Sequence, residues 1–431
     1  MAGSMRRLVL LALLSWLALC TGATHAQTLV LRNALAAPGA GAAFPADAAP
    51  VPVALPDEWA QTRPGFGGTL WYRVRFERPA ATADDELLAL LVERVCSNLE
   101  VHLNGQRVHS GGRMAEPLTE NCNHPQLVTL PAALLQPGAN LLDLKVAGHR
   151  LAEVASRQRA GGMSALTIGP HTALASRHAW LTALQVSVPQ AIGATLLLMG
   201  GFMFVLGFVN RSESHLAYFG ALSVGWALVD IPQWLRTRPI GHSEVEFLAC
   251  ATMGFTAWAA VQFLLRHAGV RDKRVDVLLP LQCALLPLSL IVAGPQHLRA
   301  VAMVWYGVLA LEVAAAALWH LRHERRRRNP WPMAVVLAAA SAAGVLEAAV
   351  QWSGMPPMAS QLAQLVLPSV LVLVGLRLMR QHGHALHRSE QDRSLLEQRV
   401  REATAEIEHN FRQLAELRVE QVTERERKRI A

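Results

Sequence analysis

Hydrophobic and polar positions follow three different patterns along the 431 residues of the chain. Over residues 27–180, short apolar stretches alternate with polar residues, which is typical of strands that bury one face. Over residues 184–381, the alternation gives way to apolar runs of about 20 residues, the length of a membrane-spanning helix. From 382 to 431 the chain is charged, with apolar residues at helical spacing. The pattern predicts a β domain, a membrane region and a terminal helix.

The first region is predicted to be an all-β antiparallel sandwich. The stretch Leu70–Phe76 alternates between apolar and charged residues. The stretch Leu99–Leu103 does the same and ends at Asn104-Gly105, a strong hairpin signal. A turn at Gln136–Asn140 precedes another strand-like stretch, Leu141–Val146. Several short strands separated by turns are typical of a β-sandwich.

The second region is predicted to be a bundle of seven transmembrane helices. A hydrophobic share of 52% with only 17% charged residues lies outside the range of soluble globular proteins. Every apolar run is long enough to cross a bilayer as a helix, which satisfies its own backbone hydrogen bonds. The predicted spans are 186–208, 215–233, 244–265, 275–293, 300–321, 331–352 and 361–380.

The net charge of +8 is distributed as in a membrane protein. Basic residues gather in alternate short loops and in the terminal helix, whereas a nucleic-acid reader concentrates them on one folded face. The loops expected inside carry Arg211, then four basic residues within 266–274, then five arginines within 322–328. The loops expected outside carry only Arg236, Arg238 and Arg299. This asymmetry predicts an exported N-terminal domain and a cytoplasmic C-terminus in a bacterial inner membrane, with no nucleic-acid partner.

Asp230, Glu312 and Glu347 are ionisable residues within these spans. A charged side chain in lipid is costly, so we expect each to face the bundle interior or a water-filled cavity. Glu312, with His320 eight residues later, is the candidate for a switch or ligand contact. The alternative for these residues is an interhelical hydrogen bond or a neutral, protonated acid.

Residues 1–26 are predicted to be a signal peptide, with two arginines, a short apolar run and a small-residue cleavage site. Export to an oxidising compartment then predicts a disulfide between Cys96 and Cys122, worth about 3 kcal/mol. The alternative is two buried free thiols. The histidines of this domain, His102, His109, His124 and His149, include no close pair at ligand spacing, so no metal is expected.

Residues 55–150 resemble the galactose-binding-like jelly roll. The resemblance rests on Trp71-Tyr72-Arg73 at the start of a strand, on Val101–Gly105 and on Leu134–Asn140. It implies a periplasmic sensor domain and makes carbohydrate a candidate ligand, with Trp71 and Tyr72 as candidate stacking residues. Aromatic residues at strand spacing are more often part of a core, and that interpretation stays open.

An exported jelly roll, seven helices and a cytoplasmic helix together resemble the seven-transmembrane receptors with diverse intracellular signalling modules. In the C-terminal region 382–431, apolar residues from Leu396 to Leu417 follow heptad spacing, which predicts a dimeric coiled coil. The alternative is a single amphipathic helix against the membrane or a partner.

The run Thr423–Ala431 resembles the segment before the phosphoacceptor histidine in sensor histidine kinases that signal to nitrate-response-type regulators. The resemblance implies the input half of a two-component system, with ATP, Mg²⁺ and a response regulator engaged by a kinase core after Ala431. The sequence itself carries no ATP-binding box and no catalytic motif, so no catalytic or cofactor-binding residue is assigned. The alternatives are a non-enzymatic receptor that acts through a separate cytoplasmic partner and, with less support, a transporter.

Overall fold

The computed structural model describes residues 28–78, 86–324, 331–353 and 357–430. The chain divides into two compact units, Met1–Val372 and Leu373–Ala431. The expected signal peptide, residues 1–26, lies outside the described residues, as does Ala431. The two units are described separately below.

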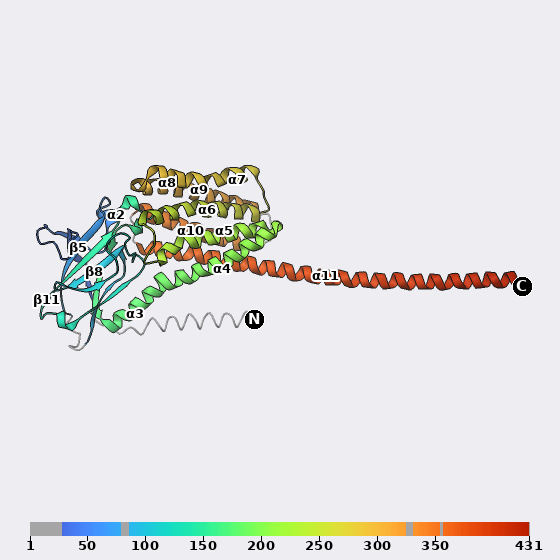
Figure 1. Cartoon of the computed structure of the whole chain (residues 1–431), viewed down its shortest axis with the longest axis horizontal. Helices are drawn as coiled ribbons and strands as arrows, with labels where there is room; N and C mark the ends of the chain where they lie inside the picture. The colour runs from blue at the N-terminus through green and yellow to red at the C-terminus, as the bar shows by residue number, and fades with distance from the viewer. Residues whose placement is uncertain (1–27, 79–85, 325–330, 354–356, 431) are drawn as a thin grey trace. The chain divides into compact units, whose positions relative to one another are not determined.

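The N-terminal part of the first unit is a sandwich of two antiparallel sheets with a third, small sheet beside them (Figure 1). The four-stranded sheet has the order β1 (Leu29–Leu31), β13 (Leu166–Pro170), β6 (Leu88–Val92) and β10 (Gln126–Leu130). The six-stranded sheet has the order β3 (Val51–Ala54), β2 (Asn33–Pro38), β5 (Gly68–Glu77), β11 (Ala139–Gly148), β8 (Asn98–Leu103) and β9 (Gln106–Ser110). The small sheet has the order β4 (Asp57–Glu58), β12 (Gly162–Met163) and β7 (Val95–Cys96).

Alternation along the strands produces the core between the two large sheets. On β5, Tyr72, Val74 and Phe76 are buried, whereas Arg75 on the opposite face is exposed. The buried face of β5 joins apolar residues of both sheets in one hydrophobic cluster. The predicted strands 70–76, 99–103 and 141–146 lie within β5, β8 and β11, so the predicted β-sandwich is confirmed at this level.

Both predicted turns are present at positions that need unusual backbone conformations. Asn104 has φ of 50° and Gly105 has φ of 86° between β8 and β9. Asn and Gly tolerate positive φ better than other residues, which explains why this dipeptide closes the hairpin. In the second turn, directly before β11, Gly138 has φ of 93°, which glycine also tolerates.

A buried hydrogen-bonded chain lies within the apolar core. The Trp59 Nε1 atom donates to the Tyr72 hydroxyl at 2.7 Å, and this hydroxyl donates to Asp57 Oδ2 at 2.7 Å. The same Asp57 oxygen accepts from Arg63 at 2.7 Å. Burial and the neighbouring Asp57 charge raise the pKa of Tyr72 far above its usual value, so the phenol remains a neutral donor.

Helix α3 (His171–Thr182) joins the sandwich to the membrane region. Its Leu174 packs with Ala89 and Leu91 on the face of β6 turned away from the main core. A π-helical turn, η4 (Ala183–Ser187), continues α3 into α4 (Val188–Val209), so that helix runs without a break for 39 residues. Proline lacks an N–H and crowds the carbonyl four residues earlier, so Pro189 accounts for the wider turn just before it.

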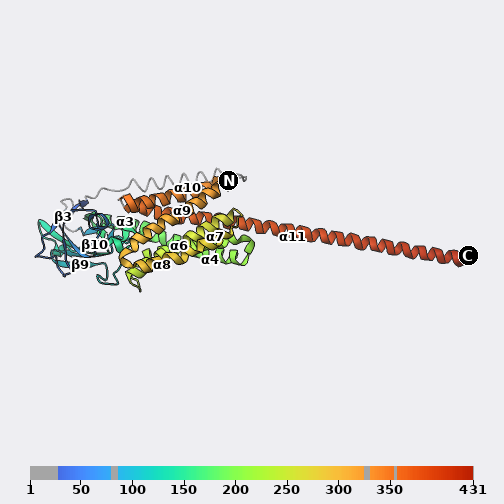
Figure 2. The same cartoon turned by 90° about the horizontal axis from the view of Figure 1, so that it is seen from above.

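Long apolar helices make up the rest of the first unit (Figure 2). Helix α4 contacts α5, α5 contacts α6, and α6 contacts both α8 and α9, while α10 contacts α9. Their bounds are α5 (Ser214–Trp234), α6 (His242–His267), α7 (Lys273–Leu278), α8 (Gln282–Ala293), α9 (Leu298–Glu324) and α10 (Trp331–Ser353).

Each of the seven predicted spans falls on helix, although the helix of the first span begins earlier, at His171, and that of the last continues to Ile430. Within the described residues, six helices are long and apolar enough to cross a membrane. Helix α5 is 21 residues long, but it is not one of the six. The fourth predicted span is interrupted, since the short 3-10 turn η6 (Leu279–Leu281) separates α7 from α8 at Pro280. The part of the first unit after the sandwich therefore contains several helices that are long and apolar enough to cross a membrane.

Helix α11 (Pro357–Ile430) is 74 residues long, and the second unit, from Leu373 onward, is its remainder. From Leu395 the described apolar residues of this helix are exposed, each by more than half of its surface. They are Leu395, Leu396, Val400, Ile407, Phe411, Leu414, Leu417, Val419 and Val422. The predicted heptad positions are thus on the surface of a continuous helix.

We expect Tyr72→Phe to destabilise the sandwich by about 1–3 kcal/mol, because the buried Trp59 N–H loses its acceptor. Hydrogen exchange of the β5 and β11 amides in the solubilised chain measures this loss of stability. Arg75→Gln, on the exposed face of the same strand, is the control and should stay within about 0.5 kcal/mol of wild type. Equal exchange in Tyr72→Phe and wild type would contradict the assigned role of the hydroxyl.

Candidate functional site

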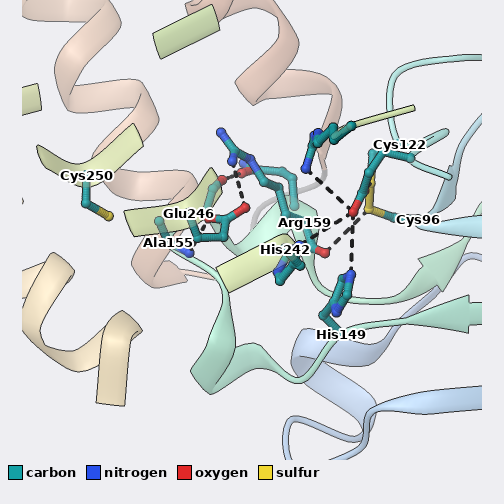
Figure 3. Close-up of polar contacts among 12 residues, drawn as sticks. Cys96, Cys122, His149, Ala155, Arg159, His242, Glu246 and Cys250 are labelled. Carbon is teal, nitrogen blue, oxygen red and sulfur yellow. Dashed lines mark hydrogen bonds and ion pairs between the residues drawn. A yellow bond between two sulfur atoms is a disulfide. The ribbon is translucent and has the colours of Figure 1, made fainter. Parts of the chain in front are cut away.

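Two loops of the sandwich contact the ends of the helices. The first interface loop is defined as residues 111–122, after β9, and the second as residues 149–161, after β11. Their partners are the segment 235–241 between α5 and α6, the start of α6 and the end of α10. Figure 3 shows the polar side chains that meet where the second loop approaches α6. These contacts form the candidate site.

The central contact is an ion pair between Arg159 of the second interface loop and Glu246 of α6. The Arg159 Nη1 atom lies 2.7 Å from Glu246 Oε1, and the Ala155 N–H donates to Glu246 Oε2 at 2.9 Å (Figure 3). The Glu246 side chain is 0% exposed. Burial lowers the pKa of Arg159, but the charge and hydrogen bond of Glu246 outweigh it and raise that pKa above its usual value. The guanidinium therefore stays charged.

Arg157 links the sandwich to the end of α10. Its Nε and Nη2 atoms donate to the two carboxylate oxygens of Glu58 in β4 at 3.0 and 2.7 Å. Its Nη1 atom donates to the Val350 carbonyl of α10 at 3.1 Å. The last carbonyls of a helix carry partial negative charge, which favours a cation there. One buried guanidinium thus binds both parts of the unit.

Gln351 of α10 continues this contact along the second interface loop. Its Oε1 atom accepts from the Arg157 N–H at 3.0 Å. Its Nε2 atom lies within hydrogen-bond distance of Ser156, Gln158 and, one turn back on α10, Glu347. The predicted intramembrane Glu347 is therefore a hydrogen-bond acceptor at the edge of this interface.

Glu120 of the first interface loop is the centre of a second cluster. Its Oε1 atom lies 3.4 Å from His149 Nε2, 3.5 Å from His242 Nδ1 and 3.7 Å from Arg238 Nη1. The His149 and His242 rings are stacked, with centroids 3.4 Å apart and planes 9° apart. Burial raises the pKa of Glu120, but the two imidazoles and the Arg238 charge outweigh it and hold that pKa well below its usual range. The carboxylate stays ionised.

Arg236 holds segment 235–241 against the first interface loop through its side chain and its backbone carbonyl. Arg236 Nε donates to Asn121 Oδ1 at 2.9 Å, and the Arg236 carbonyl accepts from the Glu120 N–H at 2.8 Å. The loop between α5 and α6 is thus bound by side chain and backbone together.

The structure brings the predicted pair Cys96 and Cys122 together as a disulfide (Figure 3). Cys96 ends β7, and Cys122 lies two residues after Glu120, so the bond fastens the first interface loop to the small sheet. The other described cysteines, Cys250 and Cys283, are free.

Trp71 and Tyr72, the candidate stacking residues, point to opposite faces of β5 and are both fully buried. Tyr72 belongs to the hydrogen-bonded chain of the core. Trp71 lies beside Lys145, whose ammonium is 5.6 Å from the ring centroid and donates to the Ala40 and Gly41 carbonyls. The segment that contains these carbonyls covers the ring. Neither ring presents a face to a ligand from solvent.

Glu312 and Asp230, the other carboxylates singled out in the predicted spans, lie on different helices. With its amide nitrogen turned toward α9, Gln282 of α8 donates to both Glu312 carboxylate oxygens at 2.7 and 3.1 Å. His320 instead faces the Leu264 carbonyl of α6, with Nδ1 at 3.0 Å. Asp230 lies on α5. The interhelical alternative foreseen for Glu312 is therefore the arrangement present.

Sequence reasoning missed the pairing of Glu246 with Arg159 and that of Glu120 with His149 and His242. One signal was available, because Glu246 falls inside the predicted span 244–265, where any carboxylate needs a partner. The partners themselves lie 87 and 93 residues away, as for Arg159 with Glu246 and His149 with His242. No local spacing connects residues so far apart.

No family model and no curated protein matches the sequence. Among solved structures, the chain is similar to a glycosyl hydrolase family 2 member from Bacteroides cellulosilyticus, with 15% identity, a TM-score of 0.26, and coverage of 33% of this chain and 20% of that chain. It is also similar to a GH2 beta-galacturonidase from Eisenbergiella tayi, with 18% identity, a TM-score of 0.25, and coverage of 34% and 24%.

A beta-glycosidase from Bacteroides vulgatus is similar at 21% identity, with a TM-score of 0.26 and coverage of 33% of this chain and 20% of that chain. The chain thus spans no more than about a quarter of the length of these three proteins. Likeness at this level carries no argument about the ligand or activity of the present chain.

We expect Glu246→Ala to release the second interface loop from α6. The Ala155 amide loses a charged acceptor worth about 1.5–3 kcal/mol, so its hydrogen exchange should accelerate roughly tenfold or more. Glu244→Ala is the matched control, since Glu244 is the same residue type in the same helical turn but is exposed. Hydrogen exchange resolved at residues 150–160 measures the effect. Identical exchange in the two variants would show that Glu246 does not hold the loop.

We expect Cys96 and Cys122 to resist alkylation in the denatured chain until a reductant is added, because their sulfurs are bonded. Mass spectrometry should then show two further alkyl groups per chain on these residues. Cys250 and Cys283 are the internal control and should react in denaturant without reductant. The absence of a mass shift on reduction would contradict the disulfide.

Proposed function

We propose that the chain is the sensor and transmembrane portion of a two-component sensor histidine kinase. In this proposal the β-sandwich receives a periplasmic ligand, the helices carry the signal across a bacterial inner membrane, and a kinase core after Ala431 uses ATP and Mg²⁺ to phosphorylate a histidine and then a response regulator. The observation that carries the proposal is the buried pairing of Arg159 with Glu246, which ties a loop of the sandwich to a helix of the membrane region.

The Arg159–Glu246 ion pair is suited to signal transmission because it is either fully formed or lost. A buried ion pair is stable only when both partners are present and well oriented, so a displaced loop loses the whole contact. Packed interfaces respond to small shifts by switching between discrete arrangements. Ligand binding that moves the second interface loop would therefore move α6 and α10 with it, or would break the contact.

Helix α3 supplies a second connection between the same two parts. It packs through Leu174 on the outer face of β6 and continues into α4. A shift of the four-stranded sheet would tilt or rotate the first membrane helix, because a continuous helix transmits motion along its axis. The π-helical turn at η4 is the place where such a helix changes most easily.

The contacts of three arginines support the proposed orientation. Arg236, Arg238 and Arg299 are the arginines expected in the outer loops, where basic residues are otherwise disfavoured. Arg236 binds Asn121, Arg238 lies 3.7 Å from Glu120, and Arg299 donates to the Gln351 carbonyl at 3.3 Å. Each has a protein partner near the sandwich, which would offset the cost of a basic residue in an outer loop. We propose seven spans, with α5 as the second and the C-terminus in the cytoplasm.

The exposed apolar residues of the second unit support the proposal of a dimer. The exposed apolar residues of α11 from Leu396 to Leu417 recur at heptad spacing, and single helices of this kind bury such a stripe against another copy. We propose a parallel two-stranded coiled coil that presents the kinase cores to each other. For the sensed ligand we propose only a chemical class, carbohydrate. A carbohydrate would need contacts other than Trp71 and Tyr72, whose rings are buried.

The reading frame that follows the Ala431 codon tests the proposal first. We expect it to continue into a histidine phosphoacceptor box and an ATP-binding domain. The encoded protein, reconstituted in nanodiscs with ATP and Mg²⁺, should form acid-labile phosphohistidine, and substitution of the phosphoacceptor by Gln should abolish it. Glu246→Ala should change the rate by about 5–150-fold, the usual size of coupling between sites, while Glu244→Ala should not.

A stop codon directly after Ala431, with no adjacent kinase frame, would overturn the kinase proposal and favour a receptor that acts through a separate partner. A kinase whose rate is equal in Glu246→Ala and Glu244→Ala would keep the enzyme but remove the proposed route of transmission.

A further inference from the structure

The side chains of Glu120, His149 and His242 bring three possible ligand atoms close together. These atoms all lie within 4.8 Å of one another. Glu120 Oε1 is 3.4 Å from His149 Nε2 and 3.5 Å from His242 Nδ1. Ligands bound to Zn²⁺ at about 2.0–2.1 Å in tetrahedral geometry are separated by about 3.4 Å. The spacing is compatible with three ligands of one metal ion.

The imidazole nitrogens can supply the lone pairs that a metal ion requires. Within the part of the chain that the structure describes, the buried His242 Nε2 has no hydrogen-bond partner, and the buried His149 Nε2 and His242 Nδ1 face the Glu120 carboxylate at the long limit of a hydrogen bond. A buried polar atom without a hydrogen bond costs about 1–3 kcal/mol, so such atoms need an explanation. The His149 side chain is only 7% exposed, which also limits access of water to its nitrogens.

The surroundings orient His149 for this role. Its Nδ1 atom faces the Glu116 carboxylate at 3.8 Å, on the opposite side of the ring from Glu120. At this distance the carboxylate makes no direct hydrogen bond, but its charge favours a proton on Nδ1 and leaves Nε2 as the lone-pair donor, as is common around histidine ligands. The Cys96–Cys122 disulfide fixes the loop that carries Glu120, and it also removes both sulfurs from the set of available thiolate ligands.

We propose that Glu120, His149 and His242 bind a divalent transition-metal ion of the Zn²⁺ type. Two imidazoles and one carboxylate match the ligand preference of Zn²⁺ and leave a fourth position open. Arg238, 3.7 Å from the same oxygen, balances the carboxylate charge. The ion joins two sandwich residues to the first residue of α6, so it would clamp the interface that the Arg159–Glu246 pair also holds. This binding site stands independently of the kinase proposal.

Metal titration of the solubilised full chain tests the site. After treatment with EDTA, Co²⁺ should bind at one equivalent per chain with visible absorption typical of nitrogen and oxygen ligands, and Zn²⁺ should displace it. His149→Ala and His242→Ala should each weaken Co²⁺ binding about tenfold or more. His297→Ala, outside the cluster, is the matched control and should bind as wild type does. Equal affinity in wild type, His149→Ala and His242→Ala would overturn the proposal.

X-ray absorption of the Zn²⁺-loaded wild-type chain is the second measurement and needs no variant that must fold. We expect two imidazole nitrogens with oxygen in the first shell. A shell that contains sulfur would assign the ion to cysteine and overturn the site. Because neither measurement involves phosphorylation, failure here is separable from failure of the proposed function.

Discussion

The contacts between the sandwich and the helices depend on a carboxylate that has no access to water. Removing Glu246 from solvent costs several kcal/mol, and this cost is offset only because Arg159 and the Ala155 amide satisfy both of its oxygens. The pairing requires the second interface loop to keep one conformation. With the loop in that conformation, Arg157 reaches both Glu58 and the end of α10, and Gln351 reaches the loop backbone. A single buried charge thus selects the geometry of the whole interface.

The sandwich is a suitable base for such an interface because its own core is rigid. Tyr72 joins the two sheets in an apolar core and is held by Trp59 and Asp57. Strand β11 ends at Gly148, next to His149, so the second interface loop begins directly from a central strand. The disulfide restrains the first loop in a similar way. Both loops are therefore fixed to the sandwich and move with it.

Much of the architecture was predictable because it depends on local periodicity. The alternation from Leu70 to Phe76 indicates which face of β5 is buried, and Asn104-Gly105 marks the hairpin because few residues tolerate its backbone angles. Apolar runs of spanning length predicted the helices to within a few residues at most ends. The uninterrupted passage from α3 to α4 was not predicted, because α3 is stabilised by packing on the sheet rather than by an amphipathic pattern of its own.

Local features of the sequence specify the three-part organisation, the strand faces, the positions of the long apolar helices and the two cysteines of the sandwich. Period, length and composition are properties of contiguous residues, and they act before any long-range contact forms. Only the tertiary structure decided that Glu246 meets Arg159, that His149 meets His242 and Glu120, and that Trp71 lies under a loop. Such meetings depend on how distant segments cross and on which buried charges find partners, and neither is encoded in the spacing of neighbours along the chain.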